Sequence, residues 1–210
     1  MRPEIELGAG AVLMVEAWRD PLVEALGHDA RSGYVEHFWL PVLGPSTVLL
    51  LRRLAGRLEA SPDGLALGLA ETSRSLGLGE RVGRNSSFVR TIARTVEFEL
   101  ARLVGPTRLA VRTVLPPLPR RYAVRLPEGL REELAGAERT AASSRAVAAD
   151  QRLRGRQLAL SLVELGEDEG ATERQLLRWR FHPALARECT EWAAAARRAT
   201  AGGEAPPSAS

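Results

Sequence analysis

Residues 83–105 read GRNSSFVRTIARTVEFELARLVG, and this stretch decides the fold that the sequence predicts. Asparagine and serine near its start are N-cap residues, and the glycine at its end is a helix stop. Between them, apolar residues recur every three or four positions, which indicates one helix over residues 86–103. The opposite face carries hydroxyls and arginines, whereas carboxylates enter only at Glu97 and Glu99. This asymmetry suits a helix whose N-terminal half faces an anion, because the helix dipole and capping hydroxyls favour negative charge there.

The neighbouring segments give the order helix, helix, helix, hairpin. Residues 44–60 predict a first helix with an apolar leucine face, and residues 66–76 predict a second one, which a glycine-rich connection joins to the third. Alternation in residues 108–114 predicts a strand. Residues 117–127 form either a turn with a return strand or a turn with two turns of helix. The order is that of a winged helix-turn-helix, which places its third helix in the DNA major groove and its hairpin on the backbone or minor groove.

Charge is distributed unevenly along the chain. All 29 basic residues are arginine, which we attribute mainly to a GC-rich genome, so their positions are more informative than their number. Residues 40–127 hold fourteen arginines and six acidic residues, a net charge of +8, whereas the rest of the chain carries −5. A basic block of this kind suits a surface that binds a polyanion. Chance clustering on a solvated face is the alternative.

We therefore predict a mainly α-helical protein with a winged helix-turn-helix core of three helices plus a β-hairpin, and with helical N- and C-terminal extensions. The expected parts are an N-terminal extension (1–39), the winged helix-turn-helix domain (40–127), a helical extension (128–200) and a disordered tail (201–210). Within the N-terminal part, Pro21 should begin a helix that Gly27 ends. The C-terminal helices are expected at about 128–149, 150–166, 171–180 and 183–199. They either pack on the core or form a homodimer, and an acidic flank could also cover the basic surface until DNA displaces it.

The predicted function is binding of double-stranded DNA, as a transcriptional regulator. The residues expected at the DNA are Arg84, Asn85, Ser86, Ser87, Arg90, Thr91, Arg94, Thr95, Arg112, Arg120 and Arg121. Arg90 and Arg94 are spaced to reach base edges or phosphates together, and Arg120 and Arg121 lie beside prolines at the expected wing tip. Phe98, which falls among the polar positions, suits a groove helix poorly. It favours the alternative function, a protein–protein interaction module built on the same scaffold.

Three short motifs resemble a family of uncharacterised actinobacterial winged-helix proteins. They are WLPVLGP (39–45), LGLG (76–79) and LPPLPRR (115–121). The resemblance extends over about residues 33–135. It implies a winged-helix fold, but it supplies no ligand or activity.

Other classes of site find little support in the sequence. The single cysteine, Cys189, excludes an internal disulfide and a Cys-based zinc site, and the three histidines lack metal-ligand spacing. No nucleophile with a base partner is recognisable, so we expect neither an enzyme nor a bound cofactor or metal. No apolar run approaches the length of a membrane span, and the N-terminus lacks the pattern of a signal peptide. The expected location is therefore the cytoplasm.

Overall fold

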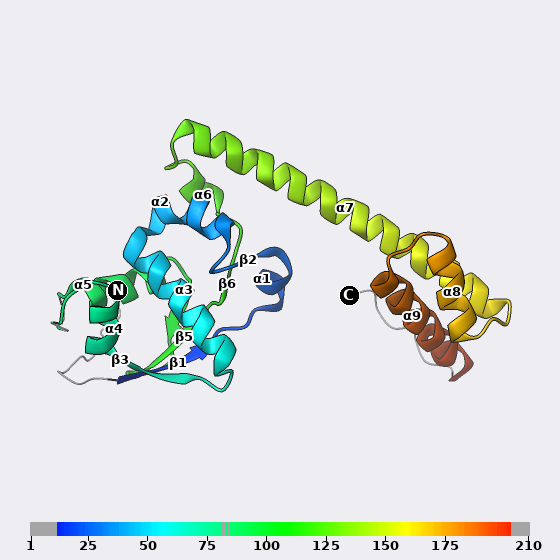
Figure 1. The fold of residues 1–210 in the computed structure, drawn as a ribbon, viewed down its shortest axis with the longest axis horizontal. Coiled ribbons are helices and arrows are strands. Elements are labelled where there is room, and N and C mark those ends of the chain that lie inside the picture. The colour runs from blue at the N-terminus through cyan, green and yellow to red at the C-terminus, as the bar shows by residue number, and fades with distance from the viewer. Residues whose placement is uncertain (1–11, 81–82, 84, 203–210) are drawn as a thin grey trace. The chain divides into compact units, whose positions relative to one another are not determined.

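The structure, a computed structural model, describes residues 12–80, 83 and 85–202 (Figure 1). The chain is mainly helical with a small sheet, as the sequence predicts. It divides into two compact units, Met1–Leu134 and Ala135–Ser210. Among the described residues, no helix combines the length and the apolar character needed to cross a membrane.

The first unit contains a four-stranded sheet with the order β3-β1-β5-β4. The strands are β1 (Val12–Ala17), β3 (Leu65–Gly68), β4 (Ala101–Leu103) and β5 (Arg108–Val111). Strand β1 pairs parallel with β5 and antiparallel with β3, and β4 pairs antiparallel with β5. A second pair joins β2 (His28–Asp29) to β6 (Val114–Leu115). The expected N-terminal extension thus contributes a central strand of the sheet.

Strand β1 forms because its residues alternate between two environments. Leu13 and Val15 are almost fully buried, whereas Val12 and Met14 are about half exposed at 47% and 45%. A period of two places the first pair on the core and the second pair on the outer face of the sheet. The residue after the strand, Trp18, continues the pairing because its N–H donates to the Val111 carbonyl at 2.8 Å.

Seven helical segments lie wholly within the described part of this unit. They are α1 (Pro21–Leu26), the π-helical η1 (Val35–Trp39), α2 (Leu40–Leu43), α3 (Pro45–Ala60), α4 (Leu69–Ser75), α5 (Ser87–Glu97) and α6 (Arg120–Ala123). The predicted helices that begin at Pro21 and near Pro45 are confirmed. Helix α3 buries Leu50, Leu51, Leu54 and Leu58 in the same core as Leu13 and Val15. Burial of this apolar face supplies most of the stabilisation of such a helix.

Two predicted helix boundaries are wrong for the same reason. Residues 66–68 belong to strand β3 instead of the second helix, and α5 ends at Glu97 instead of residue 103. Beyond α5, Glu99 takes a left-handed conformation with φ 58°, which ends the helix, and the chain then enters β4. Short strands next to a helix can continue its apolar spacing, so periodicity alone places the boundary too far along the chain.

The hairpin lies elsewhere than predicted. Strand β5 pairs with β4, so the hairpin spans residues 101–111 instead of 108–127. Residues 120–123 form α6, so the helical alternative for this segment is correct. The core-facing residues Leu115 and Leu118 hold the connecting proline-rich segment against the first unit.

The described residues of the second unit form helices joined by short turns. Helix α7 (Glu128–Glu164) begins in the first unit and runs into the second without the predicted break near residue 150. Its C-terminal part packs with α8 (Glu169–Arg178) and α9 (Pro183–Gly202), as Figure 1 shows. Their core consists of Ala159, Val163, Leu176, Ala186, Cys189 and Ala193. Pro183 begins the last helix, as predicted. Helix α9 continues through Ala201 and Gly202, the first two residues of the predicted disordered tail (201–210), and residues 203–210 lie outside the described residues.

Candidate nucleic-acid interface

Helix α5 separates its polar and apolar residues sharply. Its N-cap is Ser86, whose Oγ accepts a hydrogen bond from the Val89 N–H at 3.2 Å. Phe88 and Ile92 are fully buried and anchor the helix in the core. The exposed stripe consists of Ser87, Arg90, Arg94 and Glu97. This stripe therefore starts with a hydroxyl and two guanidiniums and meets its first carboxylate only at the last residue of the helix.

The two arginines of the stripe are held differently. Arg90 Nη2 lies 3.3 Å from Ser87 Oγ, and Arg90 makes no ion pair within the part of the chain that the structure describes. Arg94 Nη2 donates to the Val42 carbonyl at 2.7 Å, and its guanidinium lies 5.3 Å from the centre of the Phe98 ring. Arg94 thus satisfies a carbonyl near the end of α2, a role that side chains often fill at helix ends. Arg90 has the more available charge.

Three expectations about α5 need correction. Thr91 and Thr95 are buried instead of exposed, and their hydroxyls donate to the carbonyls of Ser87 and Ile92 at 2.9 and 2.7 Å. The sequence prediction placed them on the polar face because threonine carries a hydroxyl, although its methyl group packs well in a core. Phe98 is also buried, at 7% exposure, and packs against Tyr122 with ring centres 4.8 Å apart. It is therefore absent from the exposed stripe.

The β4–β5 hairpin brings a second set of arginines to the surface. Its loop, residues 104–107, contains Gly105 in a left-handed conformation with φ 91°, and the Val104 N–H donates to the Arg108 carbonyl at 2.9 Å. Arg102 and Arg108 flank this loop and are exposed. The sequence prediction missed both, although the Gly-Pro pair at residues 105–106 is a turn signal that could have located the hairpin.

Arg112, which was expected to face DNA, is buried at 8% exposure. Its Nη1 lies 3.0 Å from Asp20 Oδ2, and its Nε donates to the Glu99 carbonyl at 3.1 Å. Its guanidinium also lies 3.7 Å from the centre of the Trp18 ring. The hydrogen bond from the Val23 N–H and then the one from Arg112 lower the pKa of the Asp20 carboxyl. Arg112 is thus a structural residue, and the expectation for it is wrong.

The described residues among the remaining predicted site residues belong to segments outside the hairpin. Arg120 and Arg121 belong to α6 and are exposed, and Arg121 lies 3.9 Å from Glu99 and over the Tyr122 ring. Asn85 is exposed ahead of α5, and Arg84 lies outside the described residues. Helix α6 therefore provides exposed charge but no wing tip.

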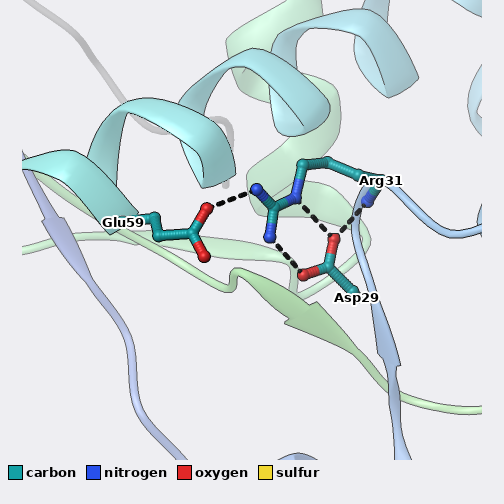
Figure 2. Close-up of polar contacts among 3 residues, drawn as sticks. All are labelled: Asp29, Arg31 and Glu59. Atoms are coloured by element: carbon teal, nitrogen blue, oxygen red, sulfur yellow. Dashed lines mark hydrogen bonds and ion pairs between the residues drawn. The ribbon is translucent and has the colours of Figure 1, made fainter.

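A half-open cavity of about 190 Å³ lies between the end of α3 and the segment around β2. Arg31 on its wall lies between two carboxylates, as Figure 2 shows. Its Nε and Nη2 bond Asp29 at 2.9 Å each, and its Nη1 bonds Glu59 at 2.5 Å. Arg31 lowers the pKa of Asp29, chiefly through these hydrogen bonds. Because these two carboxylates take up the donors of the Arg31 guanidinium, we assign this cluster to stability.

The described residues give little support for a metal site or for a reactive thiol. They contain no group of three or more histidine, cysteine or acidic side chains that could hold a metal ion. Burial raises the pKa of the Cys189 thiol, and the side chain lies in the core of the second unit. A buried thiol with a raised pKa is a poor nucleophile.

Two of the three sequence motifs, at residues 39–45 and 115–121, have structural explanations in the first unit. The motif at residues 39–45 covers α2 and the start of α3, and the motif at residues 115–121 joins β6 to α6. The two meet where the buried Trp39 donates its Nε1–H to the Pro116 carbonyl at 3.1 Å. No protein-family model, curated protein or solved structure matches the chain. The resemblance to actinobacterial winged-helix proteins therefore remains an expectation.

Proposed function

We propose that the chain binds double-stranded DNA as a winged helix-turn-helix protein and acts as a transcriptional regulator without enzymatic activity. Helix α3, strand β3, helices α4 and α5 and the β4–β5 hairpin follow one another in winged-helix order. Strand β1 is an addition to this arrangement, because it lies between β3 and β5. In this proposal α5 enters the major groove, and the hairpin tip at residues 104–107 replaces the predicted wing.

The observation that carries the proposal is the exposed stripe of α5. Ser87, Arg90 and Arg94 occupy its first part, and Glu97 lies at its end. A helix that enters a groove with its N-terminal half presents its positive dipole end to the phosphates, and arginine can bond phosphates or guanine edges. Carboxylates in the first two turns would oppose this approach, and none is present.

The charge of the surrounding segments supports the same partner. The +8 of residues 40–127 includes Arg90, Arg102 and Arg108, none of which is buried. An excess of exposed arginines within residues 40–127 would raise the local concentration of a polyanion and speed its association with the chain. A role at DNA also agrees with a cytoplasmic location, which we include in the proposal.

The alternative, a protein-interaction module, loses the feature that favoured it. Phe98 was its proposed anchor, and Phe98 packs in the core against Tyr122. Without an exposed aromatic on α5, the stripe offers charge and hydroxyls instead of the aromatic anchor on which protein interfaces commonly depend.

We also propose that two copies pair through the C-terminal helices. Winged-helix proteins gain affinity when two copies bind two half-sites. In the second unit Leu177 and Trp179, at the end of α8, remain 40% and 44% exposed. Apolar side chains of this size are common at homodimer interfaces.

The decisive experiment measures binding to random-sequence duplex DNA across a salt series. The variant Arg90→Gln/Arg94→Gln should bind more weakly, and its log–log salt slope should fall by about 0.9 for each phosphate contact removed. The matched control is Arg139→Gln/Arg145→Gln, which removes the same charge from exposed positions on α7 that make no ion pair among the described residues. Circular dichroism of each variant checks the fold, since Arg94 also bonds Val42. Absence of duplex binding by the wild type at low salt would refute the proposal.

A further inference from the structure

The ring of Trp18 lies against two guanidiniums, one from β4 and one from the residue that follows β5. The guanidinium carbon of Arg112 is 3.7 Å from the ring centre, and that of Arg102 is 4.7 Å from it. Arg102 is paired with Ala110 in the β4–β5 ladder, so Arg102 and Arg112 are diagonal neighbours on the same face of the sheet. The Trp18 N–H bonds the Val111 carbonyl, which fixes the tryptophan beside β5. The indole of the residue that follows β1 thus reaches the base of the hairpin.

The two arginines differ in what neutralises them. Arg112 is buried and bonds the Asp20 carboxylate. Arg102 is exposed and makes no ion pair with a carboxylate in the described ranges. Within the described residues its guanidinium lies over the Trp18 ring, which attracts a cation without cancelling its charge. Arg102 therefore keeps its full charge toward solvent while its guanidinium is held in place.

We propose that Trp18 is a positioning residue that orients Arg102 for contact with a DNA phosphate beside the hairpin. The inference rests on the proposed DNA-binding function and deepens it. Arginine binds phosphate through a planar fork, so a guanidinium already held against a ring loses less side-chain freedom on binding. The N-terminal strand then contributes to the DNA-binding surface although it precedes α5 by about seventy residues.

The test is a double-mutant cycle that combines Trp18→Leu with Arg102→Gln. Affinity for a random-sequence duplex and its salt slope are measured for the wild type, both single variants and the double variant. We expect Arg102→Gln to reduce the slope by about 0.9, the value for one phosphate contact. Trp18→Leu should weaken binding several-fold in the wild-type background and leave affinity unchanged in the Arg102→Gln background. A purely structural tryptophan would not produce this dependence.

Two controls separate positioning from folding. In the Arg108→Gln background, which removes an exposed arginine of the same hairpin that does not contact Trp18, the effect of Trp18→Leu should persist in full. Trp18→Phe should give an intermediate affinity, because phenylalanine attracts cations less than tryptophan does. If Trp18→Leu fails to fold, as judged by circular dichroism, the cycle with Trp18→Phe provides the same test.

Equal losses from the tryptophan substitution in both Arg102 backgrounds would overturn the inference, and so would an unchanged salt slope in Arg102→Gln. Either result would leave the DNA-binding proposal intact, because the wild type would still bind. If the wild type itself does not bind duplex DNA at low salt, both proposals fail together.

Discussion

At the scale of single residues, the second unit depends on one close approach between helices. Gly155 of α7 is buried, and a Cβ at this position would lie 2.7 Å from Cys189 Sγ and 3.2 Å from Phe181 Cε1. Cys189 is fully buried and belongs to the helical core, so it has little room to move. A glycine inside a helix costs conformational entropy, and here the cost is offset by the tight contact between α7 and α9.

Gly155→Ala should therefore destabilise the second unit. Overpacking of a core typically costs about 1–3 kcal/mol, which exceeds the gain of up to about 1 kcal/mol in helix propensity. The matched control is Gly136→Ala, where the nearest atom to the new Cβ is the flexible Arg139 Nη2 at 3.9 Å. Urea unfolding followed by circular dichroism should show a lower midpoint for Gly155→Ala only. Equal midpoints for the two variants would contradict the packing argument.

At the scale of elements, the Asp29–Arg31–Glu59 cluster ties the β2 segment to the end of α3. Because Arg31 lowers the pKa of Asp29 from its ordinary value of 3.8, the charged form of Asp29 stabilises the folded state. This contribution is present above the ordinary pKa and is lost as pH falls through the folded value. The charges are partly exposed, so salt should weaken the effect.

Asp29→Asn should lower the free energy of unfolding at about pH 6, and the difference from the wild type should shrink toward about pH 3. Chemical unfolding followed by tryptophan fluorescence measures both values. Asp63→Asn serves as the control, because Asp63 is exposed in the turn after α3 and makes no ion pair among the described residues. A difference that stays constant with pH would show that the Asp29 charge does not contribute.

The same scale explains how much of the fold the sequence could predict. The helices that begin at Pro21, Pro45 and Pro183 were predictable, because proline at the first turn is a strong local signal. Strands β3 and β4 were missed because each is short and adjoins a helix whose apolar spacing it continues. The pairing of β1 with β5 joins residues about ninety positions apart, and no local sequence pattern predicts a contact over such a separation.

The candidate site shows a similar division between local and non-local information. Ser86, Ser87 and Arg90 were placed correctly at the exposed start of α5, because capping chemistry is local. Thr91, Thr95 and Arg112 were misplaced, because only the tertiary contacts show that they are buried. Arg102 belongs to a hairpin whose partner strand could not be identified without the sheet. Residue type therefore located the start of α5 better than it identified which of the predicted side chains are exposed.

At the scale of the whole molecule, the distribution of charge bears on whether the C-terminal unit regulates binding. Residues 135–210 contain eleven arginines and ten acidic residues, whereas residues 1–39 contain three arginines and seven acidic residues. The acidic excess thus lies mainly in the N-terminal segment, which supplies an inner strand of the sheet in the first unit. A nearly neutral C-terminal unit is poorly suited to shield a basic surface by electrostatic attraction.

Removal of residues 135–210 should therefore give no gain in DNA affinity. The shortened chain keeps Leu130 and Leu134, which pack on the core of the first unit, so it should retain a cooperative thermal transition. On a duplex of about one helical turn, which offers one half-site, its affinity should lie within about threefold of that of the full chain, and its salt slope should be the same.

Sedimentation of the two chains should give a dimer for the full chain and a monomer for the shortened one, since pairing is proposed through the C-terminal helices. A large gain in affinity on truncation would instead show that the C-terminal unit covers the DNA-binding surface, and a shortened chain that still dimerises would place the dimer interface in the first unit.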